Sequence, residues 1–146
     1  FWELLSWLAR EEGVAILITT HYLSEAEHCD RLALMYAGRI VAEGTPAHLK
    51  RQVERDIGQL LEVVVDKPGV SLAHVVAAGF AGAALFGTKI HVLSRDPGRD
   101  EGRLRDVLAR SGIAVGSVRT RMLSLEDVFV SRVMALEQAA QKEVSA

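Results

Sequence analysis

The segment ILITTHYLSEAEHCDR, residues 16–31, places an ionisable side chain directly after a run of apolar and β-branched residues. His21 follows Thr19 and Thr20 at the end of this run, and a neutral imidazole can donate to a phosphate oxygen or orient an attacking water. If residues 14–19 form a buried parallel strand, His21 lies beyond its carboxyl end, where open α/β sheets bind ligands. The alternative is a locally hydrogen-bonded histidine with no chemical role.

The elements that would position His21 follow from periodicity and capping residues. Strands are expected over 14–19, 32–36 and 40–42, and helices over 1–13, 25–29 and 47–53. Ser24 and Glu27 have the spacing of a capping box, which predicts that Ser24 caps the second helix. Gly38 supplies the turn of a hairpin, and Thr45 and Pro46 begin the third helix.

A junction near residues 56–58 separates this part from a second unit. Its strands are expected over 60–65, 83–86, 89–93 and 113–119, and its helices over 71–79, 100–112 and 124–138, with 96–98 as a loop and a fraying tail after Gln138. The order β-α-β-β-α-β is that of a ferredoxin-like split βαβ sandwich. The predicted fold class is therefore α/β, with one unit over 1–56 and a small α+β domain over 57–146.

Composition excludes several classes of protein. The 146 residues are 49% hydrophobic with a net charge of −2, and no basic tract indicates nucleic-acid binding. The single cysteine, Cys29, excludes an internal disulfide framework. The longest apolar run, 75–87, is shorter than a spanning helix and contains glycines, and no signal peptide is evident. Because Phe1 falls within an amphipathic pattern, we expect a piece of a longer protein.

Other polar residues have simpler interpretations than catalysis or metal binding. His21, His28 and Cys29 lack the spacing of metal ligands, so no metal site is predicted. The remaining histidines are expected at the surface or at strand edges: His48, His74 and His91. Three arginines are expected on a solvated face, with a small basic patch as the alternative: Arg103, Arg119 and Arg121.

The stretch AILITTHYLSEAEHCDRLALMYAGRIVAEGTP resembles the last part of the nucleotide-binding domain of ABC transporters. The family pattern here is a strand, Thr-His, a Glu-Ala helix, Asp-Arg, a strand and a Gly-Arg-Ile hairpin before Gly-Thr-Pro. The likeness covers about residues 1–53, within a P-loop NTPase-type domain of which this part would be the C-terminal remnant. It implies that His21 is the switch histidine, which contacts the γ-phosphate of ATP and helps align the attacking water.

The remainder resembles the C-terminal extension of ATPase subunits of ABC-2-type exporters, with SLEDVFV (124–130) as its most diagnostic phrase. The family's G-x-x-x-x-G-K-[ST] loop, signature motif and catalytic glutamate are absent from these residues. The resemblance thus implies an ATPase that uses ATP and Mg²⁺ as the full-length protein, whereas this segment alone is expected to bind no nucleotide and to be inactive.

The resemblance also implies partners and a location. These are membrane-embedded permease subunits, a second nucleotide-binding subunit, and the cytoplasmic face of the inner membrane. Exposed apolar surface on residues 1–19 predicts self-association. The competing hypothesis is a non-enzymatic ferredoxin-like binding or regulatory module, with residues 1–56 as scaffold.

Overall fold

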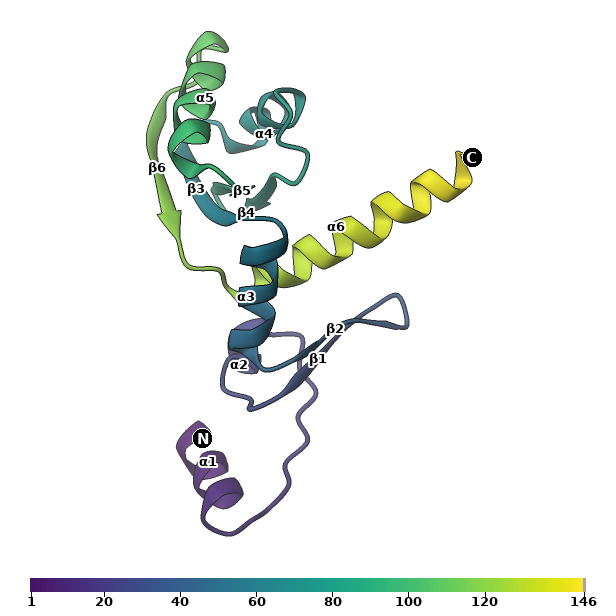
Figure 1. Ribbon diagram of the computed structural model, residues 1–146. Coiled ribbons are helices and arrows are strands. Elements are labelled where there is room, and N and C mark those ends of the chain that lie inside the picture. The colour runs from purple at the N-terminus through teal and green to yellow at the C-terminus, as the bar shows by residue number, and fades with distance from the viewer. Residues whose placement is uncertain (146) are drawn as a thin grey trace.

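The computed structural model describes residues 1–145, which form a mixed α/β structure with two antiparallel sheets (Figure 1). The helices are α1 (Trp2–Arg10), α2 (Leu23–Ala26), α3 (Pro46–Asp56), α4 (Pro68–Ala77), α5 (Pro97–Arg110) and α6 (Leu125–Val144). The strands are β1 (Leu32–Tyr36), β2 (Arg39–Gly44), β3 (Gln59–Val65), β4 (Ala84–Phe86), β5 (Lys89–Ser94) and β6 (Val115–Arg121). No helix within residues 1–145 is long and apolar enough to cross a membrane.

Strands β1 and β2 form the predicted hairpin, which leads into α3. Ala37 and Gly38 both have positive φ, at 48° and 73°, and this is the geometry of the tight turns that join twisted antiparallel strands. Thr45 caps α3 as expected, because its side chain accepts from the His48 amide, and Pro46 occupies the first turn. The predicted hairpin and the predicted start of α3 are therefore confirmed.

The second sheet has the strand order β4-β5-β3-β6, with every neighbouring pair antiparallel. From β3 to β6 the elements follow in the order β-α-β-β-α-β. Helices α4 and α5 cover one face of this sheet (Figure 1), and apolar side chains form the core between helices and sheet. Its most deeply buried members are Val63, Val75, Ile90, Leu104 and Leu108, all 0% exposed.

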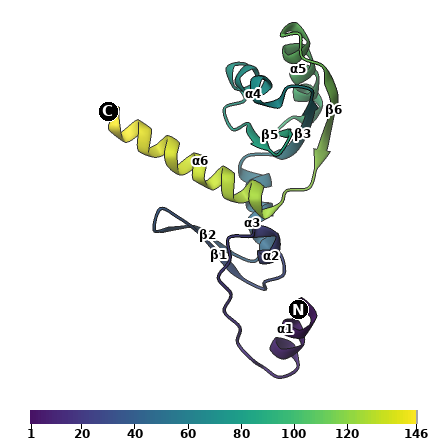
Figure 2. The ribbon, with the colours of Figure 1, turned by 180° about the vertical axis from the view of Figure 1, so that it is seen from behind.

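A second core joins the N-terminal elements to α6. Val53 of α3 and Val128 of α6 are both 0% exposed, and they pack with Ala26, Leu34 and Leu125. Both views show that α6 begins beside α2 and α3 and that its C-terminal end projects away from the rest of the chain (Figure 1 and Figure 2). The first turns of α6 therefore lie where the elements before residue 56 meet the four-stranded sheet.

The segment before α2 differs most from the sequence-based expectation. Residues 14–19 were expected to form a strand covered on both faces, but they are irregular, and Leu17 is 96% exposed. No strand of the described chain is hydrogen-bonded to them, and β-propensity alone does not form a strand without a neighbour. The parallel sheet expected around residues 14–19 is therefore not seen in the described chain, whose two sheets are both antiparallel.

Several expected helix boundaries are also wrong. Tyr22, not Ser24, is the N-cap residue of α2, and Ser71 lies inside α4, where its hydroxyl donates to the Lys67 carbonyl oxygen. Asp96 caps α5, so the expected loop at 96–98 instead starts that helix. The expected fraying after Gln138 is not seen, since α6 continues to Val144.

Candidate functional site

His21 lies in the exposed loop between α1 and α2, not at the end of a strand. Its ring packs against the neighbouring Tyr22 ring, with the centroids 4.1 Å apart. The loop is braced from within, since the Thr20 hydroxyl donates to a Glu25 carboxylate oxygen at 2.6 Å. The Tyr22 amide in turn donates to the Thr20 hydroxyl oxygen at 3.0 Å. The imidazole is therefore displayed to solvent on a loop with a defined local shape.

The expected capping box at Ser24 and Glu27 does not form, because Glu27 is engaged elsewhere. One of its carboxylate oxygens accepts from Lys50 Nζ at 2.7 Å, and the other accepts from the Leu125 amide at 3.2 Å. Lys50 belongs to α3 and Leu125 begins α6. Glu27 thus joins the end of α2 to two helices that are distant in sequence.

The other histidine and cysteine near His21 do not gather around it. The His28 ring stacks on Trp2 of α1, with the centroids 4.9 Å apart. Cys29 is a half-buried free thiol. Within residues 1–145, no group of three or more histidine, cysteine, aspartate or glutamate side chains is arranged to hold a metal ion.

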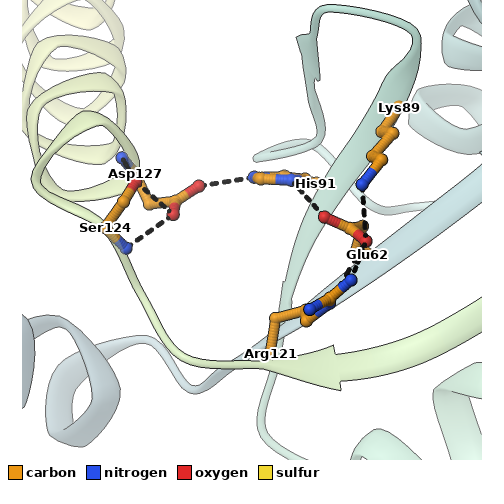
Figure 3. Close-up of polar contacts among 6 residues, drawn as sticks. All are labelled: Glu62, Lys89, His91, Arg121, Ser124 and Asp127. Atoms are coloured by element: carbon orange, nitrogen blue, oxygen red, sulfur yellow. Dashed lines mark hydrogen bonds and ion pairs between the residues drawn. The ribbon is translucent and has the colours of Figure 1, made fainter. Parts of the chain in front are cut away.

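A partly buried polar network joins the four-stranded sheet to the start of α6 (Figure 3). At its centre, His91 Nδ1 lies 2.6 Å from Asp127 Oδ1, and His91 Nε2 lies 3.5 Å from Glu62 Oε2. Asp127 completes a capping box by accepting from both the amide and the hydroxyl of Ser124. Only an imidazole that carries both protons can donate to both carboxylates.

The carboxylates of this network are held in their charged forms. Burial raises the pKa of Asp127, but hydrogen bonds from His91 and from the Ser124 amide and hydroxyl outweigh it, so its pKa is below the ordinary value. Burial likewise raises the pKa of Glu62, and contacts with Lys89, Arg121 and His91 reverse the shift to a lower pKa. The network therefore contains ionised groups that are mutually satisfied.

The network has the residue types of a nucleophilic triad but not the geometry of one. Ser124 donates to Asp127, whereas a nucleophilic serine must donate to the histidine that accepts its proton. Because Asp127 lies between Ser124 and His91, no serine in this network is activated. We interpret the network as structural contacts that hold the start of α6 on the sheet.

His91 was expected at the surface or at a strand edge, and this expectation is wrong, since its side chain is only 14% exposed. Its ring also stacks on Phe86, with the centroids 4.3 Å apart. A signal for the network exists in the sequence: Glu62 is the one charged residue in the strand LLEVVV, and Asp127 lies three residues after Ser124. Neither feature entered the predictions made from the sequence, and neither by itself indicates that the two carboxylates meet at His91.

The three arginines considered as a patch are not one cluster. Arg103 of α5 pairs with Asp100 at 2.9 Å and lies over the Phe80 ring. Arg121 of β6 instead pairs with Glu62 at 3.2 Å. Arg119 is exposed on the same strand as Arg121.

Comparison with known proteins gives a consistent set of relatives. No family model matches the chain. The probable multidrug ABC transporter ATP-binding protein YbhF of Escherichia coli is 50% identical over 46 residues, which are 32% of this chain and 8% of that protein. Nod factor export ATP-binding protein I of a Rhizobium species is 34% identical over 131 residues, 88% of this chain and 40% of that protein. The protein of the same name from Burkholderia lata is 36% identical over 132 residues, with the same coverage.

The chain therefore spans 40% or less of the length of these relatives. In the two long matches, about 18 of the 146 residues lie outside the aligned region. Even if all of them were at one end, the alignment would include both His21 and the start of α6. By this similarity, the chain belongs to the ABC transporter ATP-binding proteins, of which it corresponds to a C-terminal part.

Proposed function

We propose that the chain is the distal part of the ATP-binding and ATP-hydrolysing subunit of an ABC exporter, and that His21 contacts the γ-phosphate of ATP. The observation that carries this proposal is the similarity to ABC transporter ATP-binding proteins, which extends through His21. The exposed position of His21 on a braced loop supports it, because an imidazole that meets a nucleotide held by other residues has to face outward. There it would help align the attacking water.

ATP and Mg²⁺ would be held mainly by residues outside this chain, since it contains no G-x-x-x-x-G-K-[ST] loop. The chain alone is therefore proposed to be inactive. In the full-length protein, hydrolysis would take place in a dimer with a second nucleotide-binding subunit and would drive membrane-embedded permease subunits. The proposed location is the cytoplasmic face of the inner membrane. The names of the relatives, which refer to multidrug transport and Nod factor export, support an exporter.

The proposed division of the chain has residues 1–56 as the end of the nucleotide-binding domain and residues 57–146 as an accessory domain. The β-α-β-β-α-β order and the strand order β4-β5-β3-β6 support a ferredoxin-like accessory domain. The second core adds a detail, because α6 leaves the four-stranded sheet and packs on residues of the first unit. The accessory domain would thus be anchored to the nucleotide-binding domain by its last helix.

The test is the substitution His21→Ala in the full-length protein, with His74→Ala as a matched control. His74 is an exposed histidine on α4, far along the chain from the loop. We expect His21→Ala to lower the ATPase kcat by about 10²-fold, as for removal of a group that positions the attacking water, with ATP affinity changed little. His74→Ala should leave both unchanged. Unaltered kcat in His21→Ala would refute the assignment.

A separate experiment tests the proposal that the 146-residue chain alone binds no nucleotide. Titration calorimetry with Mg-ATP should detect no binding to this chain but clear binding to the full-length protein. Micromolar affinity for the chain alone would contradict the proposal. A reading frame that lacks a G-x-x-x-x-G-K-[ST] loop before Phe1 would instead favour the alternative, a non-enzymatic binding or regulatory module.

A further inference from the structure

Glu27 occupies a position between the His21 loop and the C-terminal part of the chain. It lies six residues after His21, at the end of α2, and its side chain is 31% exposed. It contacts α3 through Lys50 and the first residue of α6 through the Leu125 amide, 98 residues away in sequence. Among the described residues, no other hydrogen bond of residues 20–29 reaches past that segment.

The contact with α6 satisfies a group that the helix itself leaves free. The amides in the first turn of a helix have no partner within the helix, and a carboxylate is favoured there by the helix dipole. Glu27 accepts from the amide of Leu125, while the capping box satisfies the amides of Ser124 and Asp127. The first turn of α6 is thus hydrogen-bonded both to α2, through Glu27, and to the four-stranded sheet, through Asp127 and His91.

Apolar packing holds the same junction. Ala26, next to Glu27, is 8% exposed and packs in one core with Leu125 and Val128 of α6. On the other side of the helix start, Asp127 is fixed through His91 to β5. The first turn of α6 is therefore joined both to β5 of the sheet and to α2.

The loop end of this connection is also tied. Thr20 and Glu25 are joined side chain to side chain, so the residues on either side of His21 move with the start of α2. We propose that Glu27 is a positioning residue, which sets the place of the His21 loop by tying α2 to the first turn of α6. This inference rests on the function proposed above. It means that the position of His21 depends on the accessory domain, through the first turn of α6.

The first experiment measures loop order in the 146-residue chain. In Glu27→Gln, the new amide nitrogen replaces one of the two acceptor oxygens and faces either Lys50 Nζ or the Leu125 amide, so in both orientations one contact becomes donor against donor. Amide hydrogen exchange should speed up at least about tenfold for protected amides in residues 20–29, and remain unchanged in β3 and β5. Lys50→Met, which removes only the charge partner, should give a smaller change of the same kind.

The matched control is Glu43→Gln. It also neutralises a glutamate that pairs with a basic side chain, Arg31 at 3.0 Å, but this pair lies on the exposed hairpin edge. It should leave exchange in residues 20–29 unchanged. Equal exchange in Glu27→Gln and the parent chain, or equal acceleration in Glu43→Gln, would overturn the inference.

The second experiment measures ATPase kinetics in the full-length protein. A positioning role of Glu27 and a purely structural role predict different kinetics there. Glu27→Gln should lower kcat about tenfold while KM for ATP changes less than about twofold, because misplacement of a reacting group acts on turnover. A loss of kcat in His21→Ala with full kcat in Glu27→Gln would overturn the positioning role and leave the proposed function intact. Full kcat in His21→Ala would remove the proposed function, and loop exchange would still decide the role of Glu27.

Discussion

Asp127→Ala removes the carboxylate that joins the start of α6 to the sheet, and its cost can be worked from the contacts that it loses. The side chain is 4% exposed, so solvent does little to replace these contacts. Loss of the capping box costs about 1 kcal/mol, and loss of the charge-assisted bond to His91 about 1.5–3 kcal/mol. The expected loss of unfolding free energy is therefore about 2.5–4 kcal/mol, or a Tm lower by roughly 5–15 °C.

The assay is urea denaturation of the 146-residue chain followed by far-ultraviolet circular dichroism. Glu126→Ala is the matched control, since Glu126 is an exposed acid in the same helical turn and interacts mainly with the helix dipole. Its loss should cost about 0.3–1 kcal/mol. If Asp127→Ala destabilises the chain no more than Glu126→Ala does, the polar network does not hold α6 on the sheet.

The pH dependence of the stability that Asp127 contributes follows from the direction of the shift in its pKa. The pKa of Asp127 is lower in the folded chain than its ordinary value, so its contribution is fully present above about pH 4. It is lost as pH falls through the lowered folded-state pKa. The stability gap between the parent chain and Asp127→Ala should therefore narrow below about pH 4, and a gap that widens there would contradict the assigned shift.

Two further predictions concern the backbone and the N-terminal surface. Gly58→Ala should lower the free energy of unfolding in urea by more than about 2 kcal/mol, because φ is +135° and the added Cβ would collide with the Ser94 carbonyl. Gly102→Ala in α5, where the added Cβ meets nothing, should instead raise it by about 0.5–1 kcal/mol. Equal effects of the two substitutions would refute the reasoning. The 146-residue chain should self-associate in sedimentation velocity through apolar side chains such as Leu17 and Phe1, which are 96% and 84% exposed. Leu17→Lys should weaken this association, and a monomer at all concentrations would contradict the prediction.

Local signals in the sequence were sufficient where a segment and its partner are close along the chain. The β1–β2 hairpin, the Thr45–Pro46 start of α3 and the Ser124 cap of α6 each depend on residues within a few positions. They are correct because turn and capping chemistry is decided by nearby backbone groups.

The errors arise where a distant residue decides the outcome. Glu27 has the spacing of a capping box but is taken by Lys50 and Leu125, and the sequence does not show that these will be near. In the sequence His91 is one of several scattered histidines, and only the fold of the sheet and α6 brings Glu62 and Asp127 to its two nitrogens. Residues 14–19 have strand propensity without a neighbouring strand in the described chain. His21 itself was identified by family resemblance, and its role stays a prediction.

The most direct measurement is a structure of the full-length protein with Mg²⁺ and a non-hydrolysable ATP analogue. We expect an imidazole nitrogen of His21 within about 2.6–3.2 Å of a γ-phosphate oxygen, or joined to it through one water. A bound nucleotide with His21 directed away from its terminal phosphate would contradict the proposed role of this histidine.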